Sequence, residues 1–123
     1  MTITAMDLVK EAKSNITEID GERAHQLVDE GARLLDVREM AEYEAGHIND
    51  AVHISRGLLE FAIGQHPELS DKNRSIIVYC KSGGRSALAA ASLQQLGYQN
   101  VVSLAGGFDG WSKGTVVPEG LKN

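Results

Sequence analysis

The sequence predicts an α/β fold with a mainly parallel central sheet flanked by helices on both faces. Short apolar segments of strand character alternate along the chain with helical segments, which is typical of parallel α/β folds. Residues 75–79, Ser-Ile-Ile-Val-Tyr, are largely apolar and β-branched, as expected of a strand covered on both sides in the middle of a sheet. Because sites in such sheets lie beyond the carboxyl ends of the strands, residues that follow a strand are candidates for chemistry.

Each element is predicted from apolar periodicity and from the residues that begin or end it. Asp20 is a candidate N-cap for a helix that Gly31 ends, and Gly46, Pro67 and Gly97 end three later helices. Strands are predicted at residues 16–19, 33–37, 51–54, 75–79 and 101–104. Helices are predicted at residues 4–14 (a short extra N-terminal helix), between 20 and 31, around 40–45, and at 58–65, 86–96 and 107–113.

The chain has 123 residues, which fits one domain that can bury a core without disulfides. Its single cysteine, Cys80, excludes an intramolecular disulfide, a four-cysteine zinc site and a CxxC redox pair. The histidines at 25, 47, 53 and 66 lack metal-ligand spacing, so we expect no metal and no cofactor. The sequence shows neither a signal peptide nor an apolar run of membrane-spanning length, so we expect a cytoplasmic protein in a reducing compartment.

The charge of the chain is unevenly distributed. The formal net charge is −5, which disfavours electrostatic binding to nucleic acid. Residues 1–61 contain 6 Lys and Arg against 13 Asp and Glu, whereas residues 62–123 contain 6 against 4. Cys80 therefore lies in a half of the chain with a net charge of +2, where an anionic ligand would be attracted.

Residues 80–85, Cys-Lys-Ser-Gly-Gly-Arg, connect the clearest predicted strand to the strongest predicted helix. Gly83 and Gly84 can take positive φ, so that the chain curls around the sulfur and points its N–H groups inward as an anion nest. The next helix directs its positive N-terminal end at the same point, and Lys81 and Arg85 add two charges. These features favour thiolate over thiol, so we expect a reactive cysteine rather than an inert core cysteine.

The spacing of this loop separates two kinds of chemistry. A phosphatase or arsenate-reductase loop has the spacing Cys-x5-Arg and surrounds a tetrahedral oxyanion, whereas this chain has Cys-x4-Arg from Cys80 to Arg85. The shorter ring is better suited to holding the cysteine sulfur and one further sulfur bound to it. A persulfide intermediate is therefore favoured over a cysteinyl phosphate, and a phosphatase or arsenate reductase is the less favoured alternative.

Three segments resemble signatures of a known family. The first lies within residues 35–54 and includes Asp-Val-Arg-Glu and Gly-His-Ile, although Ser55 stands where many members have proline. The second is residues 78–86 around Cys80, and the third is residues 104–111, Leu-Ala-Gly-Gly-Phe-Asp-Gly-Trp. In this order and spacing they resemble the rhodanese-like domain family, and within it the single-domain sulfurtransferases of the thiosulfate sulfurtransferase type.

The resemblance implies a single rhodanese-like domain at residues 16–123, preceded by an N-terminal helical arm at residues 1–15. It also implies a thiosulfate:cyanide sulfurtransferase, in which the Cys80 thiolate takes the sulfane sulfur of a donor such as thiosulfate. A cyanide or thiol acceptor then removes the sulfur from the Cys80 persulfide. The alternative is a sulfur-relay or regulatory binding module without turnover of its own, with a protein as sulfur donor or acceptor. We expect a monomer or a weak homodimer with no nucleic-acid or membrane partner.

The resemblance also assigns roles within the loop. The main-chain N–H groups of residues 81–86 would stabilise the persulfide. Lys81 and Arg85 would bind the anionic end of the donor, although Arg85 could instead brace the loop. The predicted substrate-binding residues are Lys81, Ser82, Gly83, Gly84, Arg85 and Ser86.

Several residues outside the loop are predicted to have structural roles. Asp36 and Arg38 follow a buried strand and are expected to form a salt bridge or loop brace rather than to catalyse. His47 is expected to follow a strand and to be structural. The glycine pair 106–107 is expected to serve a tight turn. The apolar stripe of the 4–14 helix is expected to pack on this same domain.

Overall fold

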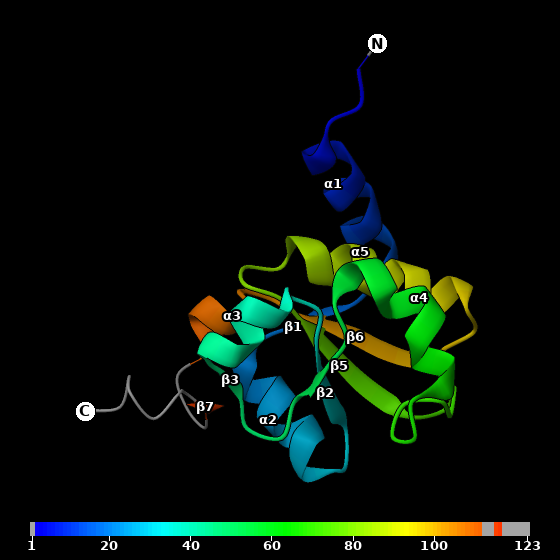
Figure 1. Cartoon of the computed structure of the whole chain (residues 1–123). Helices are drawn as coiled ribbons and strands as arrows, with labels where there is room; N and C mark the ends of the chain where they lie inside the picture. Colours follow the sequence, from blue (N-terminus) through cyan, green and yellow to red (C-terminus); the bar gives the residue numbers. More distant parts are fainter. Residues whose placement is uncertain (1, 112–114, 117–123) are drawn as a thin grey trace.

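The structure, a computed structural model, describes residues 2–111 and 115–116. A five-stranded sheet forms its centre, with the strand order β1-β6-β5-β2-β4 and parallel pairing between neighbours (Figure 1). The strands are β1 (Glu18–Ile19), β2 (Arg33–Asp36), β4 (Val52–His53), β5 (Ser75–Tyr79) and β6 (Asn100–Leu104). The predicted α/β fold with a mainly parallel sheet is therefore confirmed, with β5 at its centre.

Helices cover both faces of this sheet. One face packs against α4 (Leu59–Ala62) and α5 (Gly84–Gln95), and the other packs against α2 (Gly21–Asp29) and α3 (Met40–Ala45) (Figure 1). None of the helices in the described part of the chain combines the length and apolar composition that a bilayer crossing requires.

The residues of β5 alternate between the two faces, because successive side chains of a strand point in opposite directions. Ile76 and Val78 belong to the core beneath α4 and α5, whereas Ile77 and Tyr79 belong to the core beneath α2 and α3. Cys80 directly follows β5 and falls on the α5 side. The alternation therefore presents the sulfur of Cys80 to the first turn of α5.

The N-terminal helix α1 (Ala5–Asn15) begins with Thr4 and Asp7 capping each other's backbone N–H groups. Its buried residues, Val9 and Ala12, pack against Ala87 of α5. The expected packing of this helix on its own domain is therefore confirmed, although Leu8 of the same helix is half-exposed. Because α1 lies along the first turns of α5, it also supports the start of the helix that follows the Cys80 loop (Figure 1).

Some element boundaries differ from the sequence prediction. The predicted helix at 58–65 is a short α4 between two single 3₁₀ turns, Arg56–Leu58 and Ile63–Gln65. The predicted closing helix at 107–113 contains a 3₁₀ turn, Phe108–Gly110, and residues 112 and 113 lie outside the described residues. The antiparallel ladder of β3 (His47–Ile48) with β7 (Thr115–Val116) was not predicted, because strands of two residues carry no readable periodicity.

Candidate active site

Cys80 lies at the carboxyl end of the central strand and is 1% exposed. The chain turns back around it at Gly83, whose φ of +122° is strongly unfavourable for any residue with a side chain. Gly84, by contrast, does not take positive φ and is the first residue of α5, which starts two residues earlier than predicted. The loop around the sulfur therefore needs the backbone freedom of one glycine, not of both.

Three donors surround the Cys80 Sγ atom. The N–H of Gly83 lies 3.1 Å from Sγ, the N–H of Ser86 lies 3.4 Å away, and the Ser86 hydroxyl lies 3.6 Å away. Burial raises the pKa of the Cys80 thiol, but hydrogen bonds from Ser86, Gly83 and Ser82 more than offset it, so the pKa is lowered overall. The sulfur is therefore held in a nest of N–H and O–H donors that stabilises its negative charge.

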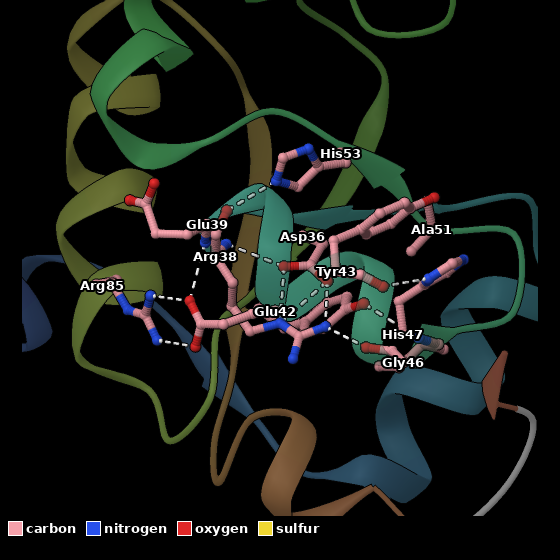
Figure 2. Close-up of polar contacts among 12 residues, drawn as sticks. Asp36, Arg38, Glu39, Glu42, Tyr43, Gly46, His47, Ala51, His53 and Arg85 are labelled. Atoms are coloured by element: carbon pink, nitrogen blue, oxygen red, sulfur yellow. Dashed lines mark hydrogen bonds and ion pairs between the residues drawn. The ribbon is translucent and has the colours of Figure 1, made fainter. Parts of the chain in front are cut away.

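Arg85 forms an ion pair with Glu42 of α3 (Figure 2). Its Nη1 and Nη2 atoms donate to the two carboxylate oxygens at 2.7 and 3.0 Å. The hydrogen bond from Arg85 is the largest cause that lowers the pKa of Glu42 to about 2. Of the two predicted roles of Arg85, this geometry favours the brace, because the guanidinium already holds a carboxylate.

Lys81 lies on the exposed outer side of the loop. Its Nζ atom is 3.1 Å from Asp109 Oδ1, and both side chains are more than half exposed. An ion pair this exposed is weak, so its lysine remains able to bind an incoming anion. A shallow depression of about 320 Å³ lies beside Lys81, and its lining includes Arg38, Glu42, Phe108 and Asp109.

The turn that follows β6 holds the loop in place from the other side. Phe108 N donates to Cys80 O at 2.8 Å, and Asp109 N donates to Lys81 O at 3.0 Å. Gly107 has a φ of +53°, and a Cβ atom there would lie 2.5 Å from Cys80 O. The sequence predicted a tight turn at this glycine pair, but a turn motif alone could not show that it contacts the loop around Cys80.

Asp36 and Arg38 form a buried salt bridge, one of the two arrangements that the sequence predicted. Arg38 donates to both Asp36 carboxylate oxygens and, at 2.7 Å, to Gly46 O (Figure 2). Its guanidinium lies 4.4 Å from the centre of the Phe108 ring. A single arginine thus joins the end of β2, the end of α3 and the turn that contacts Cys80.

The sequence predicted that His47 would follow a strand, but His47 lies within strand β3 itself. Its ring stacks on Tyr43 with centroids 3.7 Å apart, and Nδ1 lies 2.8 Å from Tyr43 O (Figure 2). These contacts agree with a structural role. In the described residues, no group of three or more His, Cys, Asp or Glu side chains could hold a metal ion.

Comparison with known proteins agrees with this geometry. A family model described as "Rhodanese-like domain" matches residues 20–114. The chain belongs to the rhodanese-like domain family. Within this family, its relatives include proteins that are named for sulfur transfer.

Three relatives of this rhodanese-like domain are informative. A protein named "Sulfurtransferase" from Allochromatium vinosum is 38% identical over 85% of this chain and 99% of its own length. "Thiosulfate sulfurtransferase GlpE" from Haemophilus influenzae is 36% identical over 78% of this chain and 88% of its own. "Putative sulfur carrier protein YrkF" from Bacillus subtilis is 38% identical over 83% of this chain and 54% of its own.

A solved structure from Rhodopseudomonas palustris superposes with a TM-score of 0.81 at 31% identity, covering 90% of both chains. That protein is described as one of unknown function and as a "Possible Tyrosine Phosphatase". The rhodanese-like fold is therefore shared by proteins to which different anion chemistries are ascribed, and the loop around the cysteine must separate them.

Proposed function

We propose that this rhodanese-like domain is a sulfurtransferase that carries a sulfane sulfur on Cys80, with thiosulfate as a donor. The observation that carries the proposal is the ring of N–H and O–H donors around Sγ, which favours a reactive thiolate at the centre of the loop. The relative named thiosulfate sulfurtransferase supports thiosulfate as the donor.

The proposed reaction has two displacements. In the first, the Cys80 thiolate attacks the outer sulfur of thiosulfate, a new S–S bond forms, and the old S–S bond breaks as its electron pair leaves with sulfite. In the second, an acceptor such as cyanide attacks the outer sulfur of the persulfide and leaves as thiocyanate, which regenerates the Cys80 thiolate. Both steps balance without an added oxidant, reductant or metal.

Lys81 is proposed to receive the anionic end of the donor. Among the described residues its charge partner is the exposed Asp109, whereas Arg85 is already held by two hydrogen bonds from its guanidinium to Glu42. The depression beside Lys81 provides an approach on the same side of the loop. Ser82, Gly83, Gly84 and Ser86 would form the backbone of the nest for the persulfide.

A thiosulfate:cyanide assay tests turnover directly by measuring thiocyanate. Wild-type protein is expected to form thiocyanate catalytically, and Cys80→Ser is expected to abolish it while keeping the Tm. Lys81→Ala is expected to raise the KM for thiosulfate, and Lys72→Ala, which removes a lysine near Tyr98, is the charge-matched control. Turnover that persists in Cys80→Ser would exclude the mechanism.

A sulfur carrier is the second candidate, because one relative is named a putative sulfur carrier protein. The near-complete burial of Cys80 also suits a persulfide that is shielded between partners. A carrier would become persulfidated by a protein donor yet form no thiocyanate from thiosulfate and cyanide. A single thiol of this kind suits a reducing compartment, so we propose the cytoplasm as its location.

Phosphatase chemistry is less favoured, although one similar structure has been described in that way. The ring from Cys80 to Arg85 is one residue shorter than a phosphatase loop, and the arginine that would bind a phosphate holds Glu42 instead. Strong hydrolysis of an aryl phosphate that depends on Cys80 would overturn this ranking.

A further inference from the structure

Two buried hydroxyl groups are linked by successive contacts to the Cys80 sulfur. Ser86 is in the first turn of α5, and Ser103 is on β6, the strand next to β5. Both residues are fully buried, and their Oγ atoms lie 2.8 Å apart. The sequence does not single out Ser103, because one serine in an otherwise apolar strand carries no motif.

Ser103 stands where an apolar side chain would be expected. Side chains on β6 alternate, and Val101, two residues earlier, belongs to the apolar core beneath α5. A hydroxyl buried in that core destabilises the fold unless it is hydrogen bonded. Its one side-chain partner among the described residues is the Ser86 hydroxyl, so this contact is what keeps Ser103 satisfied.

The number of protons on the two hydroxyls decides which serine donates the hydrogen bond between them. If Ser103 donates to Ser86 Oγ, the proton of Ser86 remains available for a second acceptor. Two acceptors are in reach, namely Cys80 Sγ at 3.6 Å and Gly83 O at 3.2 Å. If Ser86 donated to Ser103 instead, the Ser103 proton would have no acceptor among the described residues and the sulfur would lose its hydroxyl donor. The first arrangement satisfies both buried groups.

The charge on the inner sulfur decides between the two acceptors of Ser86. A thiolate is a charged acceptor, and hydrogen bonds to charged groups are roughly twice as strong as neutral ones. Once the sulfur is protonated, or becomes the neutral inner atom of a persulfide, the carbonyl of Gly83 is the better acceptor. The Ser86 proton can therefore move between Sγ and Gly83 O while Ser103 keeps donating to its oxygen.

We propose that Ser103 is a positioning residue for sulfur transfer: it donates to the Ser86 hydroxyl and thereby directs the Ser86 proton at the Cys80 sulfur when that sulfur is ionised. Its relevance to transfer rests on the proposed function, but its effect on the free thiolate does not. A donated hydrogen bond also polarises the Ser86 hydroxyl and makes it a stronger donor. Removing the Ser103 hydroxyl should therefore destabilise the Cys80 thiolate relative to the thiol, although no group that contacts the sulfur is removed.

The test is the pKa of Cys80 measured from ultraviolet thiolate absorbance, with Cys80→Ala protein as the baseline. The measurement is clean because Cys80 is the sole cysteine of the chain. Ser103→Ala is expected to lower the thiolate-to-thiol ratio on the order of threefold at fixed pH, which is a rise of roughly half a pKa unit. Ser103→Thr, which keeps a hydroxyl, is expected to restore the ratio. Ser92→Ala, which removes a hydroxyl from α5 that contacts Arg56, is the matched control and should change nothing.

A double-mutant comparison makes the test independent of the threonine variant. In a Ser86→Ala background, Ser103→Ala is expected to cause no further rise in the pKa, because the hydroxyl through which it acts is gone. An unchanged pKa in Ser103→Ala, or an equal rise with and without Ser86, would overturn the proposal. Melting curves of all variants separate these effects from loss of folding.

The same variants distinguish failure of this inference from failure of the proposed function. If wild-type protein forms no persulfide with thiosulfate but the pKa pattern holds, sulfur transfer is refuted and the role of Ser103 toward the thiolate stands. If the persulfide forms and the pKa pattern fails, the role of Ser103 is refuted and sulfur transfer stands.

Discussion

Gly107→Ala tests whether the turn after β6 holds the Cys80 loop in its active geometry. Gly107 has a φ of +53°, which imposes a strain of about 1–3 kcal/mol on alanine. The new Cβ would also lie 2.5 Å from Cys80 O and 2.7 Å from the carbonyl carbon and oxygen of Lys81. This overlap with backbone atoms adds about 1–3 kcal/mol, because neither partner can rotate away.

The total destabilisation of Gly107→Ala is therefore about 2–6 kcal/mol, which in a domain of this size lowers the Tm by about 10 °C or more. Relief of the overlap must move Cys80 O, and with it the donors aligned on Sγ. We therefore expect the thiolate fraction and the rate of sulfur loading from thiosulfate to fall per molecule of folded protein.

Two neighbouring glycines provide controls for the separate contributions. Gly106 has a φ of +79°, and a Cβ atom added there would have the Gly110 Cα, at 4.0 Å, as its nearest contact in the described residues, so Gly106→Ala tests strain without overlap. Gly110 does not take positive φ, and a Cβ atom added there would meet no described atom within 4 Å, so Gly110→Ala should leave the Tm and the loading rate close to those of the wild type. If Gly107→Ala matched Gly106→Ala in both Tm and thiol pKa, the turn would not support the loop and the reasoning would be refuted.

Further predictions concern the brace, the acid limit of stability and the N-terminal helix. Arg85→Ala is expected to lower the Tm and to leave the KM for thiosulfate little changed; a raised KM at constant Tm would assign Arg85 to the donor. The pKa of Glu42 is lowered from 4.5 to about 2, so its stabilising contribution is present above pH 4.5 and is lost as the pH falls toward about 2. Glu42→Gln should therefore weaken the dependence of stability on pH between pH 4.5 and about 2. An acid-unfolding curve identical to that of the wild type would contradict this. Arg38→Ala leaves a buried carboxylate unpaired and should destabilise the fold by about 3–5 kcal/mol in denaturant titrations. Val9→Asp should lower the Tm while Leu8→Asp, at a half-exposed position of the same helix, should not.

Much of the fold is readable in the sequence because local signals and burial agree there. The β-branched residues of β5 and the capping residue Asp20 match their structural roles directly. The secondary structure of residues 56–65 was harder to predict, because the chain there uses single 3₁₀ turns that have the apolar spacing of a helix.

The candidate site was less predictable, because side-chain partners depend on the fold. The loop sequence indicated that Cys80 would be surrounded by N–H donors, and the structure places Gly83 and Ser86 there. It did not show that Arg85 would be held by a glutamate 43 residues earlier, which left two roles open. Nor did it identify Ser103, because its contact with Ser86 depends on how β6 packs against α5.

The mass of the intact protein after incubation with thiosulfate tests the central claim most directly. We expect a gain of one sulfur atom in the wild-type protein, its removal by cyanide, and no gain in Cys80→Ala. A wild-type protein that gains no sulfur from thiosulfate, or a gain that persists in Cys80→Ala, would contradict it.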